Sequence, residues 1–128
     1  MKKIVRMLAL ALVIVIAASS VGCGEPKRPE YISDSLFQYG SKAIEIIDDY
    51  LDRKISQKEA KDELQKIEVR GRIIQKQDHE EGTREHTYDT LVTSKVWYIG
   101  SSLDYNTRSE ILEDRNDLAD MIGVKPRK

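Results

Sequence analysis

One short segment of the chain carries the residue types of a metal centre. His79, Glu80 and His86 lie within the segment 79–86, HEEGTREH. Zinc accepts imidazole nitrogen and carboxylate oxygen as ligands. The helical zinc motif, however, requires a second histidine four residues after the first, and that position holds Thr83. We therefore predict a solvated polar loop here and no metal site.

Several acidic residues are spaced as a general acid and base could be: Asp48, Asp49 and Asp52 in one group, Glu113 and Asp114 in another. With 34% charged residues, such pairs also arise by chance on helix surfaces. Only a pocket would shift their pKa values into a useful range. The chain has no Gly-rich phosphate loop, calcium loop or G-x-S-x-G. We predict no catalytic residue, no cofactor and no enzyme.

Aromatic residues give the strongest candidate for a binding site. Trp97 falls opposite the apolar arc of the helix expected over 84–103, with Tyr98 beside it and Tyr105 beyond. An exposed Trp can stack on a sugar ring or anchor a partner protein. Alternatively, Trp97 packs on a second neighbouring helix. For Tyr98 and Tyr105, packing at the edge of the core is favoured.

The N-terminus has the order of an export signal. Lys2, Lys3 and Arg6 precede an uninterrupted apolar run over 7–18. A dozen residues at about 1.5 Å each fall short of the roughly 30 Å of hydrocarbon that a spanning helix crosses. Cys23, which follows, is the only cysteine, so no intramolecular disulfide is possible.

The residues before Cys23 carry a family resemblance. Small residues at 17–20 lead into Val21-Gly22-Cys23, and this end of the signal resembles the lipobox of bacterial lipoproteins. The resemblance implies cleavage before Cys23, acylation of its thiol, and attachment to membrane lipid on the outer face of the bacterial cytoplasmic membrane. Two or more acyl chains give stable anchoring. An uncleaved signal anchor and a plain secreted protein are the alternatives.

Cleavage before Cys23 would leave 106 residues, enough for one domain. The expected division is a signal peptide over 1–22, a lipidated cysteine and tether over 23–31, a helical domain over 32–124 and a frayed basic tail over 125–128. The mature chain has 18 basic and 22 acidic residues, a net charge of about −4. This balance argues against nucleic acid as a partner.

Four helices are expected in the domain. The first runs over 33–52 with Ser33 or Asp34 as its N-cap; the second opens at a capping box, Ser56 to Glu59; the third covers 84–103. A shorter fourth opens at a second capping box, Thr107 to Glu110, and stops at Gly123 with Pro126 beyond. The fold class is all-α: a small antiparallel bundle of three main helices and a shorter fourth.

The first two helices are expected to form a hairpin, because the connection at 54–55 is short. The second helix carries a narrow apolar stripe: Ala60, Leu64, Ile67, Gly71 and Ile74. Gly71 in this stripe indicates a close approach by another backbone, or a bend. Residues 43–64 resemble hairpins of small uncharacterised bacterial proteins and lipoproteins, a resemblance that implies a fold and no activity.

Three functions remain open. The first is a membrane-anchored lipoprotein of the cell envelope that acts as a non-enzymatic binding or scaffolding module for another envelope protein. The second is a ligand- or glycan-binding lipoprotein that uses Trp97 as a stacking platform. The third is an immunity or exclusion lipoprotein of a mobile element, suggested by the small size of the protein and its expected attachment to a membrane.

Overall fold

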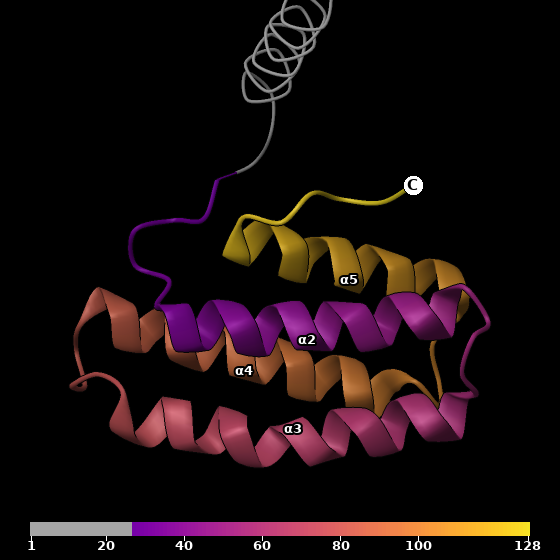
Figure 1. Cartoon of the computed structure of the whole chain (residues 1–128), viewed down its shortest axis with the longest axis horizontal. Helices are drawn as coiled ribbons and strands as arrows, with labels where there is room; N and C mark the ends of the chain where they lie inside the picture. The colour runs from indigo at the N-terminus through magenta and orange to yellow at the C-terminus, as the bar shows by residue number, and fades with distance from the viewer. Residues whose placement is uncertain (1–26) are drawn as a thin grey trace, which may run out of the picture.

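A computed structural model describes residues 27–128, which form four α-helices and no strand (Figure 1). These are α2 (Asp34–Leu51), α3 (Gln57–Gln77), α4 (Arg84–Ser102) and α5 (Arg108–Ile122). The predicted all-α class, with three longer helices and a shorter fourth, is confirmed. The predicted signal peptide and Cys23 lie outside the described residues.

The helix starts follow their capping residues. The Ser33 hydroxyl accepts a hydrogen bond from the backbone of Leu36, and Ser56 with Glu59 forms both bonds of the predicted capping box. At α5 only half of the predicted box forms. The Thr107 hydroxyl accepts from the Glu110 backbone, but it also donates to the Glu110 carboxylate, which therefore does not reach back to the N-cap amide.

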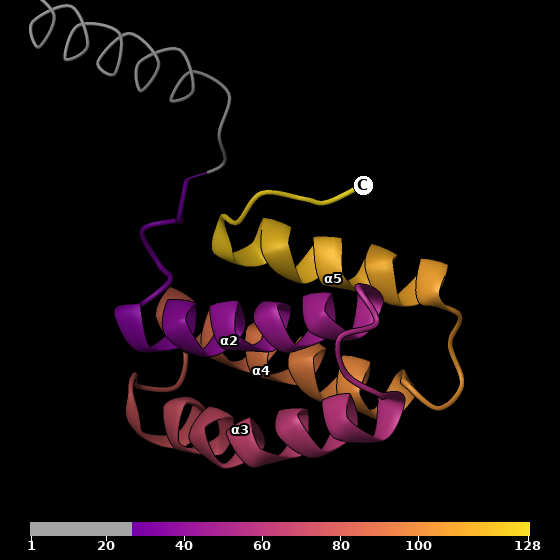
Figure 2. The same ribbon diagram turned by 45° about the vertical axis from the view of Figure 1, so that its right-hand side comes forward.

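Each helix runs antiparallel to the next one in the chain (Figures 1 and 2). The expected α2–α3 hairpin is present, and α2 also packs against α4 and α5. In contrast, α3 and α5 do not touch, so they lie on opposite sides of the α2–α4 pair. Among the described helices, α2 therefore has three neighbours.

The core lies where the four helices meet. Its largest fully enclosed apolar side chains are Leu36, Ile47, Ile74, Val92, Ile99, Leu103, Ile111, Leu118 and Ile122. On α4 the apolar residues Leu91 and Tyr98 are 45% and 48% exposed. Thr93 and Ser102 are buried instead. Their hydroxyls donate to backbone carbonyls one turn back in α4, which makes their burial tolerable.

Both ends of the described chain pack on the bundle, contrary to the predicted tether and frayed tail. The ring of Tyr31 stacks on that of Tyr88 with 3.9 Å between centroids, and the Arg28 guanidinium pairs with Asp34 at 2.6 Å. Lys27 passes so close to the end of α5 that a Cβ on Gly123 would clash with its carbonyl oxygen. Gly123 also has φ +78°, the left-handed conformation expected of a helix C-cap.

Candidate binding site between α3 and α4

Trp97 stands on α4 at the rim of the groove that separates α4 from α3, with 59% of the residue exposed. Its side chain borders two neighbouring hollows in this groove. One is about 60 Å³, with Leu64 and Gly100 among its lining residues. The other is about 170 Å³ and lies beside Gly71. Both hollows are also lined by Tyr39 and Glu68, so Trp97 divides one continuous groove.

Tyr39 reaches this groove from α2. The residue is 5% exposed, and its ring passes under α3 at Gly71, where an added Cβ would stand 2.7 Å from the hydroxyl oxygen. Burial, and secondarily the charge of Glu68, raise the pKa of the Tyr39 hydroxyl above its ordinary range. None of the side-chain hydrogen bonds found within residues 27–128 involves this hydroxyl, and its oxygen is not among the fully buried atoms without a partner, so water in the groove can reach it. A donor and acceptor is thus held at the groove without a protein partner.

The charged residues of the groove are paired. The Arg72 guanidinium donates to Glu68 at 2.8 Å, and the Lys61 ammonium is bonded to Asp104, which also accepts from Gln57. This hydrogen bond, which the Lys61 ammonium donates to the Asp104 carboxylate, raises the pKa of Lys61. The same bond lowers the pKa of Asp104. The groove is therefore polar at its rim but carries no net charge from these four groups.

The other two predicted binding residues do not join Trp97 in the groove. Tyr98 is 48% exposed and lies toward α5, where the ammonium of Lys95 stands 5.5 Å from its ring centroid and pairs with Asp114 at 2.9 Å. Tyr105, 85% exposed, follows the end of α4. The expected packing of both tyrosines at the edge of the core is wrong. For Trp97, exposure and packing on a second neighbouring helix were both open, and the structure leaves the residue 59% exposed.

The histidine segment is a largely exposed polar loop, as predicted, but His79 makes a partly buried contact from it. His79 Nδ1 lies 2.6 Å from one carboxylate oxygen of Asp89, a residue with no exposed surface. The other carboxylate oxygen and Nδ1 of His86 are buried without a partner. No three acidic, histidine or cysteine side chains of residues 27–128 are arranged to hold a metal ion. His79 thus links the α3–α4 connection to a buried carboxylate, a contact that stabilises the otherwise costly Asp89.

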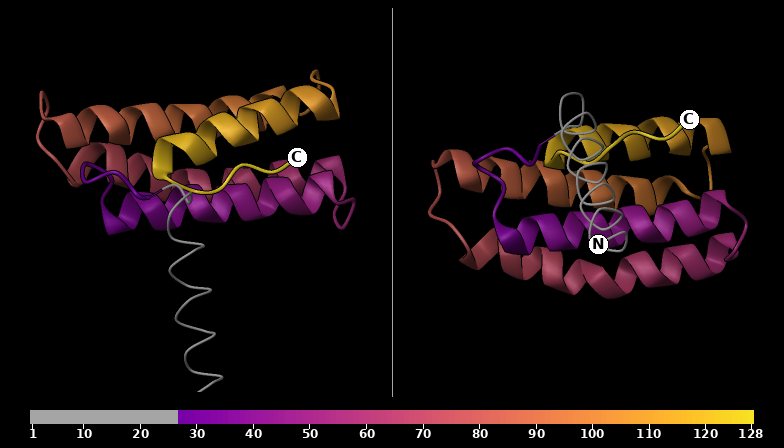
Figure 3. Two further views of the ribbon diagram at one scale, coloured as in Figure 1. Left: turned by 90° about the horizontal axis from the view of Figure 1, so that it is seen from above. Right: turned by 45° about the horizontal axis from the view of Figure 1, so that its top comes forward.

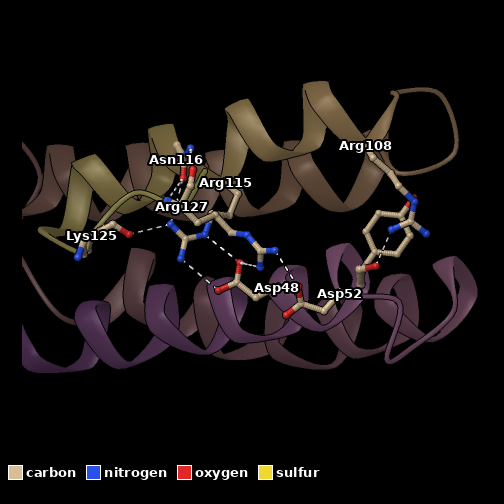
Figure 4. A network of polar contacts seen from close by, with 8 residues as sticks. Asp48, Asp52, Arg108, Arg115, Asn116, Lys125 and Arg127 are labelled. Atoms are coloured by element: carbon tan, nitrogen blue, oxygen red, sulfur yellow. Dashed lines mark hydrogen bonds and ion pairs between the residues drawn. The ribbon is translucent and has the colours of Figure 1, made fainter.

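Asp48 and Asp52 belong to an ion-pair network (Figure 4). Arg115, 5% exposed on α5, donates Nε and one guanidinium nitrogen to the two oxygens of Asp48 at 2.9 and 3.1 Å. Arg127 of the tail donates to Asp48 at 3.1 Å and to Asp52 at 2.7 Å. Its hydrogen bond lowers the pKa of Asp52. These carboxylates hold α2, α5 and the tail together, which leaves them unsuited to acid–base exchange with a substrate.

The tail is fixed by backbone contacts as well. Asn116 of α5 bonds to the backbone of Arg127 through both ends of its side-chain amide, at 2.8 and 2.9 Å, and Arg115 donates to the carbonyl of Lys125 at 2.8 Å. The tail consequently lies over the seam between α2 and α5 (Figure 3).

Sequence reasoning missed the residue that gives the groove its chemistry. Neither Tyr39 nor Glu68 is among the residues that the sequence predicted for a binding site. The available signal was Gly71, a glycine inside the stripe of a helix. It does allow a close approach, but by the side chain of Tyr39 and not by a backbone.

Comparisons with known proteins give no relative: no family model, no curated protein and no solved structure matches the chain. Within residues 27–128, none of the helices has the length and apolar content that crossing a bilayer requires.

Proposed function

We propose that this protein is a membrane-anchored lipoprotein of the bacterial cell envelope whose helical domain is a non-enzymatic binding module. The binding site is the α3–α4 groove. The observation that carries this proposal is the indole of Trp97, 59% exposed at a groove that also contains the unpartnered hydroxyl of Tyr39. A large aromatic side chain beside a hollow is the kind of group that contributes most when a ligand removes it from water.

The place where the described chain begins is compatible with an anchor on one side of the bundle and a binding site on the other. The segment from Lys27 and the C-terminal tail lie on the α2 and α5 side of the bundle, whereas α3 lies on the opposite side (Figures 1 and 2). Lys27, the first described residue, follows Cys23 by four positions in the sequence. The α3 wall of the groove would remain available to a component of the envelope.

The anchor is tested by fatty-acid labelling and membrane fractionation of wild type and Cys23→Ala. We expect label on the wild-type protein, and loss of both label and membrane retention in the variant. A mature protein that keeps residues 1–22, or a Cys23→Ala variant that stays on the membrane, would contradict the lipoprotein assignment.

The groove is tested separately with a photo-crosslinking amino acid. Ser101 is exposed and lines the groove, and Ser109 is an equally exposed serine on α5. Crosslinking from position 101 in intact cells should give a discrete adduct that Trp97→Ala removes, while position 109 gives none. The same adduct from both positions, or an adduct that survives Trp97→Ala, would exclude the groove as the binding site.

A further inference from the structure

The unpartnered hydroxyl in the groove limits what can occupy it. We propose that the α3–α4 groove binds one neutral pyranose ring of an envelope glycan, stacked against Trp97 and hydrogen-bonded to Tyr39 Oη. This inference rests on the proposed function, because it names the ligand class of the same groove. Four features support it: the Tyr39 hydroxyl, the Trp97 face, the volume of the groove and its charge.

The Tyr39 hydroxyl favours a ligand that carries hydroxyl groups. The residue is 5% exposed and its oxygen has no protein partner in residues 27–128. An apolar side chain of a partner protein that covered this oxygen would remove it from water without replacing the lost hydrogen bond. A sugar hydroxyl can both donate to and accept from it. Gly71 leaves the room that this hydroxyl occupies, so its position is built into the packing of α2 on α3.

Trp97 supplies the surface on which such a ring can lie. One face of a pyranose ring presents C–H groups, which are attracted to the negative face of an aromatic ring. The hydroxyls at the edge of the sugar then meet polar side chains around the indole. Gln65, Glu68 and Gln75 line the two hollows that Trp97 divides, and they provide amide donors and carbonyl or carboxylate acceptors.

Volume and charge limit what the groove itself can hold. The hollows of about 60 and 170 Å³ are below the range of roughly 300–1,000 Å³ typical of pockets for drug-sized molecules. The groove therefore has room for a single ring that stays partly exposed. Because Lys61 is paired with Asp104 and Arg72 with Glu68, neither a phosphate nor an acidic peptide finds a free cation among these groups.

The experiment uses the fact that Trp97 is the only tryptophan of the chain. The full-length protein is reconstituted in phosphatidylcholine vesicles, which add no fluorescence of their own, and titrated with N-acetylglucosamine and its β-1,4-linked dimer. We expect a saturable change in Trp97 emission with a dissociation constant on the order of 1 mM, as befits one small ring. The dimer should bind only slightly more tightly, because its second ring lies outside the groove.

Two variants test the geometry. Tyr39→Phe removes the hydroxyl and keeps the ring, and it should weaken binding about tenfold. Glu68→Gln replaces a carboxylate of α3 that lines the groove, and it should weaken binding at least about threefold. This second variant keeps the test valid if Tyr39→Phe fails to fold. Tyr98→Phe is the matched control, since Tyr98 lies outside the groove, and its dissociation constant should equal that of the wild type.

Absence of any emission change up to about 50 mM sugar would overturn the pyranose assignment. If the crosslink from position 101 still depends on Trp97 in that case, the proposed function stands and the occupant is a protein. Equal binding by wild type, Tyr39→Phe and Glu68→Gln would equally overturn the assignment, because the sugar would then lie elsewhere. Loss of the crosslink together with loss of sugar binding would contradict both proposals.

Discussion

A Cβ atom at position 71 would stand 2.7 Å from the hydroxyl oxygen of Tyr39, closer than such atoms approach in folded proteins. Glycine in the middle of a helix is less favourable than alanine by about 1 kcal/mol. At this position of α3 it makes room for a side chain of α2 whose polar end reaches the groove beside Trp97. The packing of the first hairpin and the chemistry of the groove thus depend on the same pair of residues.

Gly71→Ala should therefore destabilise the domain although it improves helix propensity. The steric conflict with the Tyr39 ring, typically about 1–3 kcal/mol for an overpacked site, outweighs the gain of about 1 kcal/mol. Urea unfolding of the single variant should show a lower midpoint with an unchanged slope. In a Tyr39→Leu background, where the ring is gone, the same substitution should stabilise. A stabilising effect of Gly71→Ala in the wild type would show that Tyr39 does not occupy the space below α3.

Tyr39→Phe should change the free energy of unfolding by less than about 0.5 kcal/mol at neutral pH, because no intramolecular hydrogen bond is lost. In alkaline solution the free energies of unfolding of the wild type and of Tyr39→Phe should diverge. The folded-state pKa of Tyr39 is raised, so the wild type loses stability as the pH rises above the unfolded value of about 10, by up to about 1.4 kcal/mol per pH unit. Urea unfolding of wild type and Tyr39→Phe at neutral pH and near pH 11 measures the difference in stability under both conditions. Parallel loss in the two proteins would contradict the burial of this hydroxyl.

Arg115→Met should be strongly destabilising, because it leaves Asp48 with only the partly exposed Arg127 as a partner. Losing one member of a buried pair costs about 3–5 kcal/mol, and since Asp48 keeps some access to water we expect about 2–3 kcal/mol. Adding Asp48→Leu should recover part of this loss, because no unpaired charge remains. Chemical denaturation of the three variants measures the coupling. A loss below about 0.5 kcal/mol for Arg115→Met would mean that the ion pair does not hold α2 to α5.

Arg127→Ala should free the tail and leave the bundle folded. Its pairs with Asp48 and Asp52 are partly exposed and contribute little to global stability. Hydrogen exchange should show faster exchange of the amides of Lys125, Arg127 and Lys128 and unchanged exchange in α2. Because Arg127 lowers the pKa of Asp52, its contact with Asp52 is present above the unfolded value near 4 and is lost as the pH falls through the folded value. Unchanged exchange of the tail in Arg127→Ala would show that the backbone contacts from Asn116 and Arg115 retain it without the Arg127 side chain.

The helices could be predicted because their signals are local. Ser33, Ser56, Thr107 and Gly123 each fix a helix end through bonds within a few residues, and all four act as expected at that level. The Glu110 half of the second box failed because a threonine hydroxyl can also donate to the carboxylate that should have reached the backbone.

What depends on contacts between distant segments could not be read from periodicity. Leu91 and Tyr98 remain exposed although they are apolar, because α4 packs on three helices and buries the arc that contains Thr93 and Ser102. Arg115, Arg127 and Asp48 are indistinguishable in the sequence from other surface charges, since 67 residues separate Arg115 from Asp48. For the same reason the sequence pointed to Trp97 but not to Tyr39, 58 residues earlier.

The measurement that tests the central claim most directly is acrylamide quenching of Trp97 fluorescence in the full-length protein, native and in urea. With 59% of the residue exposed, the native quenching constant should be at least about half of the value in urea. A native constant below about a tenth of the urea value, with blue-shifted emission, would show that Trp97 packs inside the protein. The α3–α4 groove would then lack the aromatic surface on which its proposed binding function depends.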